Sequence, residues 1–186
     1  KRKDGNPWGV SFMRMFDMAN DSGLFMDTFA TDALPLYEAK MVHQFDHRWA
    51  TYTAEGDSRD VTEAEKADPP YTVTPRYWVN AAEVEERLTK RDREGNVIWR
   101  WNRNWLMGWW DICRSTDERT VIASVVGRVG TGDTLLLMFP DPKHEAKVAC
   151  LLADQCSLVH DYVARQKIGG RHLKYHVKKQ IVNLPP

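Results

Sequence analysis

Cysteine is scarce in this chain, and long apolar runs are absent from it. The 186 residues include three cysteines, and no two of them form a Cys-x-x-Cys pair. An odd number without such spacing supports neither a disulfide framework nor a structural zinc site. No apolar run approaches the length needed to cross a membrane, and no signal peptide is visible. These absences favour a cytoplasmic protein with no membrane partner.

An excess of charge of either sign is also missing, because 26 basic residues balance 26 acidic ones. This balance argues against a nonspecific cationic binder, but it permits a specific one if the charges are segregated. Residues 157–186 hold six lysines and arginines against one aspartate, whereas residues 53–68 hold six acids against two cations. We expect the basic end to face phosphate, and residues 53–70 to form an exposed acidic loop that points away from it. The alternative is a basic end that is only a solvated amphipathic face.

Signatures of catalysis are weak. The chain has no glycine-rich strand-to-helix turn of the kind that binds S-adenosylmethionine. The sequence DPPY (residues 68–71) spells the tetrapeptide with which adenine methyltransferases hold a flipped base, but a charged segment precedes it where a buried strand is needed. Asp32, Glu38 and Lys40 fit a metal-dependent nuclease pattern that is frequent by chance. We therefore expect no catalytic residue, metal or cofactor in this chain. An enzyme acting through either motif is the alternative.

Hydrophobic periodicity and turn residues predict one α+β domain over residues 1–186, with an irregular, mostly antiparallel sheet and a C-terminal helical hairpin. Strands are expected near residues 9–16, 36–45, 71–79, 98–112, 120–126 and 134–139. Asn80 is expected to cap a short helix, and Asp141 before a proline marks another helix start. Apolar residues at helical spacing then predict one helix, or two that break near Ser157, ending at the glycine pair 169–170.

The stretch PLYEAKMVHQFDHRWATY (residues 35–52) mixes donors, acceptors and aromatic rings. Such a mixture suits a surface that grips phosphates and base edges, and an edge strand with a polar rim is the alternative. The candidate DNA contacts here are Lys40, Gln44 and Arg48. His43 and His47 lack a third ligand, so a metal site is not expected.

Tryptophan is abundant between residues 99 and 110, where five of the eight tryptophans of the chain lie. Tryptophan usually fills the core, so most of these rings are expected to be buried rather than stacked on a base. The polar residues between them are the better candidate contacts, namely Arg100, Asn102, Arg103 and Asn104.

The stretch QKIGGRHLK (residues 166–174) is the strongest local DNA candidate. Its glycines allow a close approach to a phosphate, and its cations add charge. The candidate contacts are Lys167, Arg171 and Lys174. The alternative is a glycine pair that ends a helix, flanked by solvated lysines. Arg114 and Arg119 are interpreted as an internal ion-pair network with nearby acids, with a phosphate clamp as the alternative.

The chain resembles the target-recognition region of large adenine-specific DNA methyltransferases from restriction-modification and phage-defence systems, including type IIG-like enzymes. The blocks that carry this resemblance are NPWGVSFMRMFDMANDSGLF (residues 6–25), residues 35–52, PRYWV (residues 75–79), DICRSTDERTVIASVV (residues 111–126) and VARQKIGGRHLKY (residues 163–175). The end, with its glycine turn and LPP exit, is similar to recognition domains of type I specificity subunits.

The resemblance implies a sequence-specific module that binds double-stranded DNA and positions it for a catalytic methyltransferase domain of the same polypeptide. The S-adenosylmethionine would bind in that domain, so this fragment alone is expected to be inactive. The remaining alternative is a protein–protein docking domain of a defence complex.

Overall fold

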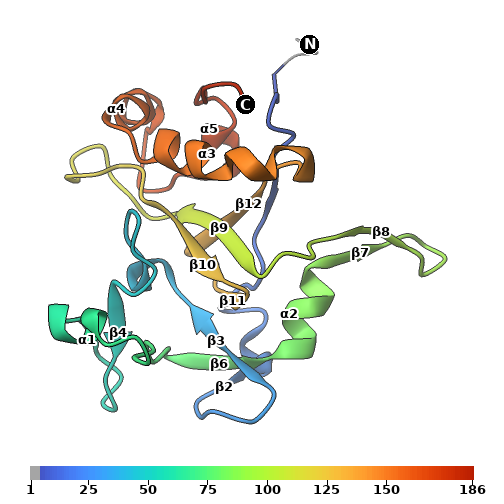
Figure 1. Cartoon of the computed structure of the whole chain (residues 1–186), viewed down its shortest axis with the longest axis vertical. Helices are drawn as coiled ribbons and strands as arrows, with labels where there is room; N and C mark the ends of the chain where they lie inside the picture. Colours follow the sequence, from blue (N-terminus) through green and yellow to red (C-terminus); the bar gives the residue numbers. More distant parts are fainter. Residues whose placement is uncertain (1–4) are drawn as a thin grey trace.

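The computed structural model describes residues 5–186, which fold as an α+β domain with several mostly antiparallel sheets and a C-terminal helix pair (Figure 1). The fold class expected from the sequence is therefore confirmed. Within residues 5–186, none of the helices has both the length and the apolar character that a membrane crossing requires.

The first sheet is fully antiparallel and forms the centre of the molecule. Its strands, in spatial order, are β1 (Ser11–Met13), β12 (Leu135–Phe139), β9 (Trp105–Trp110) and β10 (Ala123–Gly127). All five residues of β12 are buried, as expected for an apolar strand covered on both faces. Gly108 in β9 is required by close packing, since a Cβ there would lie 2.8 Å from the Leu136 carbonyl oxygen.

The second sheet lies at the other end of the molecule and mixes strand directions. Its strands are β11 (Gly130–Thr131), β3 (Ala33–Tyr37), β6 (Tyr77–Asn80) and β2 (Phe25–Met26). The pair β11–β3 is parallel and the other pairs are antiparallel. One core cluster joins the two sheets, with Phe16, Leu36, Val79, Leu106 and Leu137 fully buried in it.

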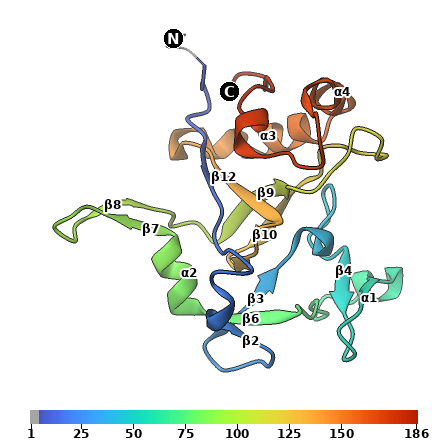
Figure 2. The same cartoon turned by 180° about the vertical axis from the view of Figure 1, so that it is seen from behind.

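Two hairpins extend from this body. They are β4 (Ala50–Tyr52) with β5 (Ser58–Asp60), and β7 (Thr89–Arg91) with β8 (Val97–Arg100). The β7–β8 hairpin projects on the side of the molecule away from helix α4 (Leu158–Lys167) in both views (Figures 1 and 2).

The helices begin where capping residues predict them. The Asn80 side chain accepts a hydrogen bond from the Ala82 N–H at the start of α2. The Asp141 side chain, which precedes Pro142, accepts a hydrogen bond from the Lys143 N–H in the same way. Ser157 caps α4, which confirms two helices rather than one. The helical segments are η1 (Ser22–Leu24), η2 (Ala39–Met41), α1 (Glu63–Ala67), α2 (Ala81–Arg87), η3 (Pro142–Lys147), α3 (Val148–Gln155), α4 (Leu158–Lys167) and α5 (Tyr175–Lys178).

The late helices cover one face of the first sheet (Figure 1). Leu151, Ala164 and Val177 from α3, α4 and α5 share a second core cluster with Trp109 and Met138 of the sheet. This packing fixes the position of the segment that follows α4, which carries the strongest candidate contacts.

Two expectations about local structure were wrong in part. The strand expected over residues 36–45 ends at Tyr37, because η2 follows and Phe45 adopts a left-handed φ of 59°. The segment 53–70 is mostly exposed, as expected, but it is no continuous loop. It contains β5 and α1, which is stabilised by a capping box between Thr62 and Glu65.

Candidate nucleic-acid interface

Five basic side chains gather where the segment after α4 meets the end of β9. We call Arg114, Lys167, Arg171, His172 and Lys174 the cationic cluster. All are exposed except Lys174, which is half-buried. They come from two loops that are more than 50 residues apart in the sequence, so only the tertiary fold assembles them.

Backbone hydrogen bonds hold this segment rigidly against β9. The Cys113 N–H donates to the Arg171 carbonyl at 3.0 Å, and the Leu173 N–H donates to the Asp111 carbonyl at 2.7 Å. The indole N–H of buried Trp109 donates to the Leu173 carbonyl at 2.8 Å. The segment therefore forms a short antiparallel bridge with the residues that follow β9, and its backbone is held in place before any ligand arrives.

A buried carboxylate orients two members of the cluster. Asp111 is 3% exposed, and its Oδ2 lies 2.6 Å from Lys174 Nζ and 2.8 Å from His172 Nδ1. The Lys174 side chain is still 42% exposed, so its ammonium can donate outward as well as to Asp111. The other oxygen of Asp111 is buried without a hydrogen-bond partner in the structure.

The other cations of the cluster are available to a ligand. Among the ion pairs of the described residues, none involves Arg114, Lys167 or Arg171. Exposed cations that lack an internal partner are the groups that neutralise phosphates most readily.

The glycine pair beside these cations is not explained by packing within the chain. A Cβ at Gly169 or Gly170 would meet no atom within 4 Å, and neither glycine has a left-handed φ. Helix α4 ends instead at Lys167, and its C-cap residue Ile168 has an extended backbone. The pair therefore does not cap the helix in the left-handed conformation, and the open space beside it leaves the backbone accessible.

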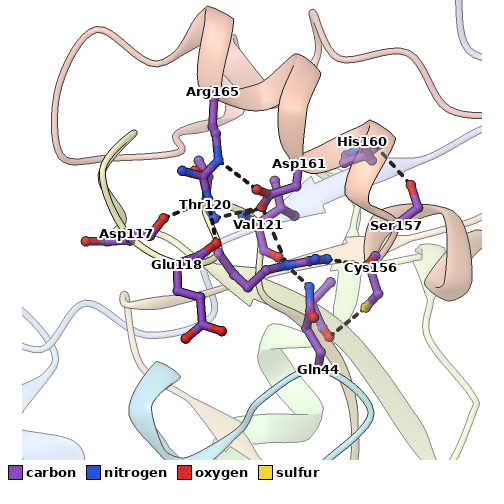
Figure 3. A network of polar contacts seen from close by, with 12 residues as sticks. Gln44, Asp117, Glu118, Thr120, Val121, Cys156, Ser157, His160, Asp161 and Arg165 are labelled. Carbon is purple, nitrogen blue, oxygen red and sulfur yellow. Dashed lines mark hydrogen bonds and ion pairs between the residues drawn. The ribbon is translucent and has the colours of Figure 1, made fainter.

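The buried carboxylate of Asp161 and the partly exposed Arg165 fix the loop that carries Arg114 (Figure 3). Asp161 accepts hydrogen bonds from the backbone N–H groups of Thr120 at 2.7 Å and Val121 at 2.8 Å, and from Arg165 Nε at 2.9 Å. The Arg165 guanidinium also donates to the carbonyls of Ser115, Asp117 and Glu118. Arg119 turns inward to the Cys156 carbonyl and lies 3.9 Å from Asp161. Arg119 therefore belongs to an internal network, whereas Arg114 is exposed.

Two of the residues predicted to contact DNA, Gln44 and Arg48, instead bond to backbone carbonyls within the fold. Gln44 Nε2 donates to the Val121 carbonyl at 2.9 Å, which ties its loop to the loop of Arg114. The Arg48 guanidinium donates to the carbonyls of Lys66 at 2.7 Å and Tyr71 at 3.2 Å. Lys40 is exposed, with Nζ 4.6 Å from the centre of the Tyr52 ring. Of the three, only Lys40 makes no hydrogen bond or ion pair within the described residues.

The group expected between the tryptophans does not join the cationic cluster. Arg100 is the last residue of β8, and Asn102, Arg103 and Asn104 lie between β8 and β9; the β7–β8 hairpin projects on the side of the molecule away from α4 (Figures 1 and 2). Arg100 pairs with Glu85 at 2.6 Å, and Arg103 pairs with Glu145 at 2.6 Å. Asn102 accepts a hydrogen bond from Arg103 at 2.8 Å. Asn104 is exposed. Trp101 and Trp109 are buried, whereas Trp99, Trp105 and Trp110 are only partly so.

The residues of the two motifs that suggested catalysis lie in surroundings other than those that the chemistry requires. Asp68 follows the exposed helix α1, not a buried strand. Glu38 accepts a hydrogen bond from the Tyr52 hydroxyl at 2.6 Å. The described residues contain no group of three histidines, cysteines or acids that is placed to hold a metal ion.

The sequence analysis did not name His172, and it gave a phosphate contact of Arg114 only as the alternative to an internal ion-pair network. The signal for His172 was its place two residues before Lys174, because alternate residues of an extended segment share a face, and both side chains contact Asp111. No sequence signal identifies Asp111 as the partner of His172 and Lys174, because these contacts span 61 and 63 residues.

No family model, curated protein or solved structure matched the chain in comparisons with known proteins.

Proposed function

We propose that this chain is the sequence-specific DNA-recognition module of an adenine-specific DNA methyltransferase from a restriction-modification or phage-defence system. It binds double-stranded DNA and presents it to a catalytic domain of the same cytoplasmic polypeptide. That domain binds S-adenosylmethionine, and this fragment transfers no methyl group by itself.

The observation that carries the DNA-binding part of the proposal is the cationic cluster beside the open glycine pair. Lys167 and Arg171 flank Gly169 and Gly170, whose backbone is open to solvent. Exposed cations next to accessible backbone N–H groups match the donors that proteins use on phosphate oxygens. The methyltransferase part rests on the resemblance of five sequence blocks.

The cationic cluster is suited to holding the DNA by its phosphates, whereas specificity for a DNA sequence requires contacts to base edges. Arg114 has a guanidinium group that can make the two-pronged contact to guanine, while Lys167 and Arg171 hold phosphate. The network of Asp161 and Arg165 fixes the backbone beside Arg114, which reduces the entropy lost when that side chain is ordered on DNA.

A second candidate function is protein docking, because α4 exposes apolar side chains. Leu158 and Val159 are each 75% exposed, and Tyr162 is 66% exposed on the following turn. An apolar strip of this kind is typical of helix-in-groove recognition. It lies on the helix that leads into the cationic cluster, so both functions are compatible in one molecule.

Selection from a pool of random duplexes tests the proposal. The isolated chain is expected to enrich a defined sequence, and Arg114→Ala is expected to reduce the discrimination at one position of that sequence by about 1–3 kcal/mol. The same preparation is expected to show no methyl transfer from S-adenosylmethionine and no Mg²⁺-dependent cleavage. Turnover in either assay, or binding without any sequence enrichment, would contradict the proposal.

A further inference from the structure

A cavity of about 520 Å³ opens between the N-terminal segment, strands β1 and β12, helix α3 and the residues that follow α5. Apolar side chains form much of its wall, among them Trp8, Phe12, Met138, Leu151 and Ile181. The volume lies within the range of about 300–1,000 Å³ that is typical of small-molecule sites. The cavity is therefore large enough to enclose a small organic molecule with an apolar body.

Three polar side chains of the wall form one hydrogen-bonded chain. Lys178 Nζ donates to Gln155 Oε1, and Gln155 Nε2 donates to Asn183 Oδ1. All three residues line the cavity. Asn183 is half-buried, whereas Gln155 and Lys178 are 1% and 4% exposed. The chain thus leads from a partly exposed amide to a buried amine.

The ammonium form of Lys178 keeps one donor for a ligand. An ammonium has three donors, and the acceptors that Nζ meets in the part of the chain that the structure describes are Gln155 Oε1 and, at 3.3 Å, His160 Nε2. The centre of the Trp109 ring lies 5.6 Å from Nζ, and a ring face attracts a cation without neutralising it. The third N–H can therefore donate to an acceptor in the cavity.

The same ammonium has no anion paired with it. Among residues 5–186, no carboxylate lies within ion-pair distance of Lys178 Nζ, and no acidic residue lines the cavity. Asp154 on α3 acts on the amine from farther away, and its carboxylate accepts the Leu184 N–H at 3.1 Å and lies 3.9 Å from His160 Nδ1. An unpaired buried charge costs free energy, and an anion that reaches it offsets part of that cost.

The other titratable groups that face Lys178, apart from Asp154, are neutral near pH 7. Burial, together with the charge of Lys178, lowers the pKa of His160 to about 3. Burial raises the pKa of the Cys113 thiol to about 11, and it also raises the pKa of Cys156. Burial lowers the pKa of Lys178 itself to about 7. Lys178 is therefore the group in these surroundings whose charge changes near neutral pH.

We propose that the cavity binds a small organic acid, whose carboxylate pairs with Lys178 while its apolar body packs against Trp8, Phe12 and Leu151. A single ammonium matches the one negative charge of a carboxylate, whereas a phosphate dianion would bring a second charge without a partner into the same apolar surroundings. The inference goes beyond DNA binding, because none of the five residues of the cationic cluster lines this cavity.

Octanoate and octanamide test the inference, because they share the apolar chain and differ in charge. By isothermal titration calorimetry at about pH 6, where Lys178 is protonated, we expect octanoate to bind about tenfold more tightly than octanamide. Octanoate is expected to bind about tenfold more weakly at about pH 8 than at about pH 6, while the affinity for octanamide stays the same. Equal affinities of the two compounds, an octanoate affinity that does not change with pH, or binding of neither compound would overturn the inference.

Propanoate tests the apolar part of the site. It carries the same carboxylate on a much shorter chain, so it is expected to bind at least about tenfold more weakly than octanoate. An equal affinity for the two acids would show a site for the charge alone and would overturn the inference.

Two neighbouring lysines provide matched variants. Lys178→Met is expected to abolish both the preference for octanoate and its pH dependence, with urea unfolding as the check that the variant folds. Lys179→Met removes an exposed lysine from the same wall and is expected to keep both properties. Loss of the preference in Lys179→Met but not in Lys178→Met would place the carboxylate at the exposed lysine and would overturn the inference.

Duplex binding separates this inference from the proposed function. Lys167→Ala with Arg171→Ala is expected to weaken duplex binding and to leave octanoate binding unchanged, because neither residue lines the cavity. If the chain binds a duplex with a sequence preference but does not bind octanoate, only the cavity inference fails. If it binds octanoate with the expected pH dependence but binds no duplex, the cavity inference holds and the proposed function fails.

Discussion

Lys178 makes the stability of this protein depend on pH in a direction opposite to that of most lysines. Its side chain is 4% exposed and lies near Gln155 and His160, with no carboxylate paired to it in the structure. Burial lowers the pKa of this ammonium from 10.5 to about 7. A tenfold change in an ionisation constant corresponds to about 1.4 kcal/mol. The charged form therefore destabilises the folded state by about 5 kcal/mol relative to the neutral form.

The direction of this pH dependence follows from the number of protons bound by the folded and the unfolded chain. Below pH 7 both the folded and the unfolded chain carry the proton, so the full destabilisation is present. Between pH 7 and 10.5 the unfolded chain keeps the proton that the folded chain has lost, and stability rises with pH. We expect the free energy of unfolding in urea to increase by about 3 kcal/mol from about pH 6 to about pH 9.

Lys178→Met is the variant that tests this reasoning. It is expected to remove the rise above pH 7, and to increase stability at about pH 6 by a few kcal/mol, less the loss of a donor to Gln155 of about 1–3 kcal/mol. Burial, together with the nearby charge of Lys178, lowers the pKa of His160 to about 3. The stability that His160 contributes is lost as the pH falls below 6.5, and Lys178→Met, which removes a charge 3.3 Å from His160 Nε2, is expected to make that loss smaller. A wild-type profile that is flat from about pH 7 to about pH 9 would refute the argument.

Three further substitutions probe the parts of the structure that support the interface. Asp161→Ala leaves the N–H groups of Thr120 and Val121 without acceptors, and is expected to destabilise the protein by about 3–5 kcal/mol in urea unfolding; a loss below about 1 kcal/mol would contradict the network. Arg48→Ala is expected to lower stability by about 2–3 kcal/mol while DNA affinity changes less than about twofold in anisotropy titrations, and a large loss of affinity would restore Arg48 as a contact. Asn80→Ala removes the cap of α2 and is expected to shift the urea midpoint by the equivalent of about 1 kcal/mol, with no change in binding.

Local signals in the sequence predicted the helices well. Asn80, Asp141 and Ser157 each accept the backbone hydrogen bond that their side chains suggest, because capping depends only on the next two or three residues. The strand expected over residues 36–45 failed for a non-local reason. Its second half turns away into η2, where the Trp49 N–H donates to the Met41 carbonyl and Trp110 donates to Val42.

The difference between local and non-local interactions also explains which of the candidate DNA contacts are exposed in the structure. Lys167 and Arg171 are exposed as predicted, since glycine and cations next to each other in the sequence rarely fill a core. Gln44 and Arg48 look like contacts in the sequence, yet they bond to carbonyls between 18 and 77 residues away. Arg100 and Arg103 were grouped with the interface by composition, but their partners Glu85 and Glu145 are separated from them along the chain.

The salt dependence of duplex binding tests the central claim most directly. Each phosphate contact changes the slope of log K against log salt by about 0.9, so Lys167→Ala with Arg171→Ala is expected to reduce the magnitude of that slope by about 1.8. The matched control, Arg93→Ala with Lys147→Ala, removes two exposed cations elsewhere and is expected to leave the slope unchanged. A slope that falls equally in both double variants, or in neither, would contradict an interface built on the cationic cluster.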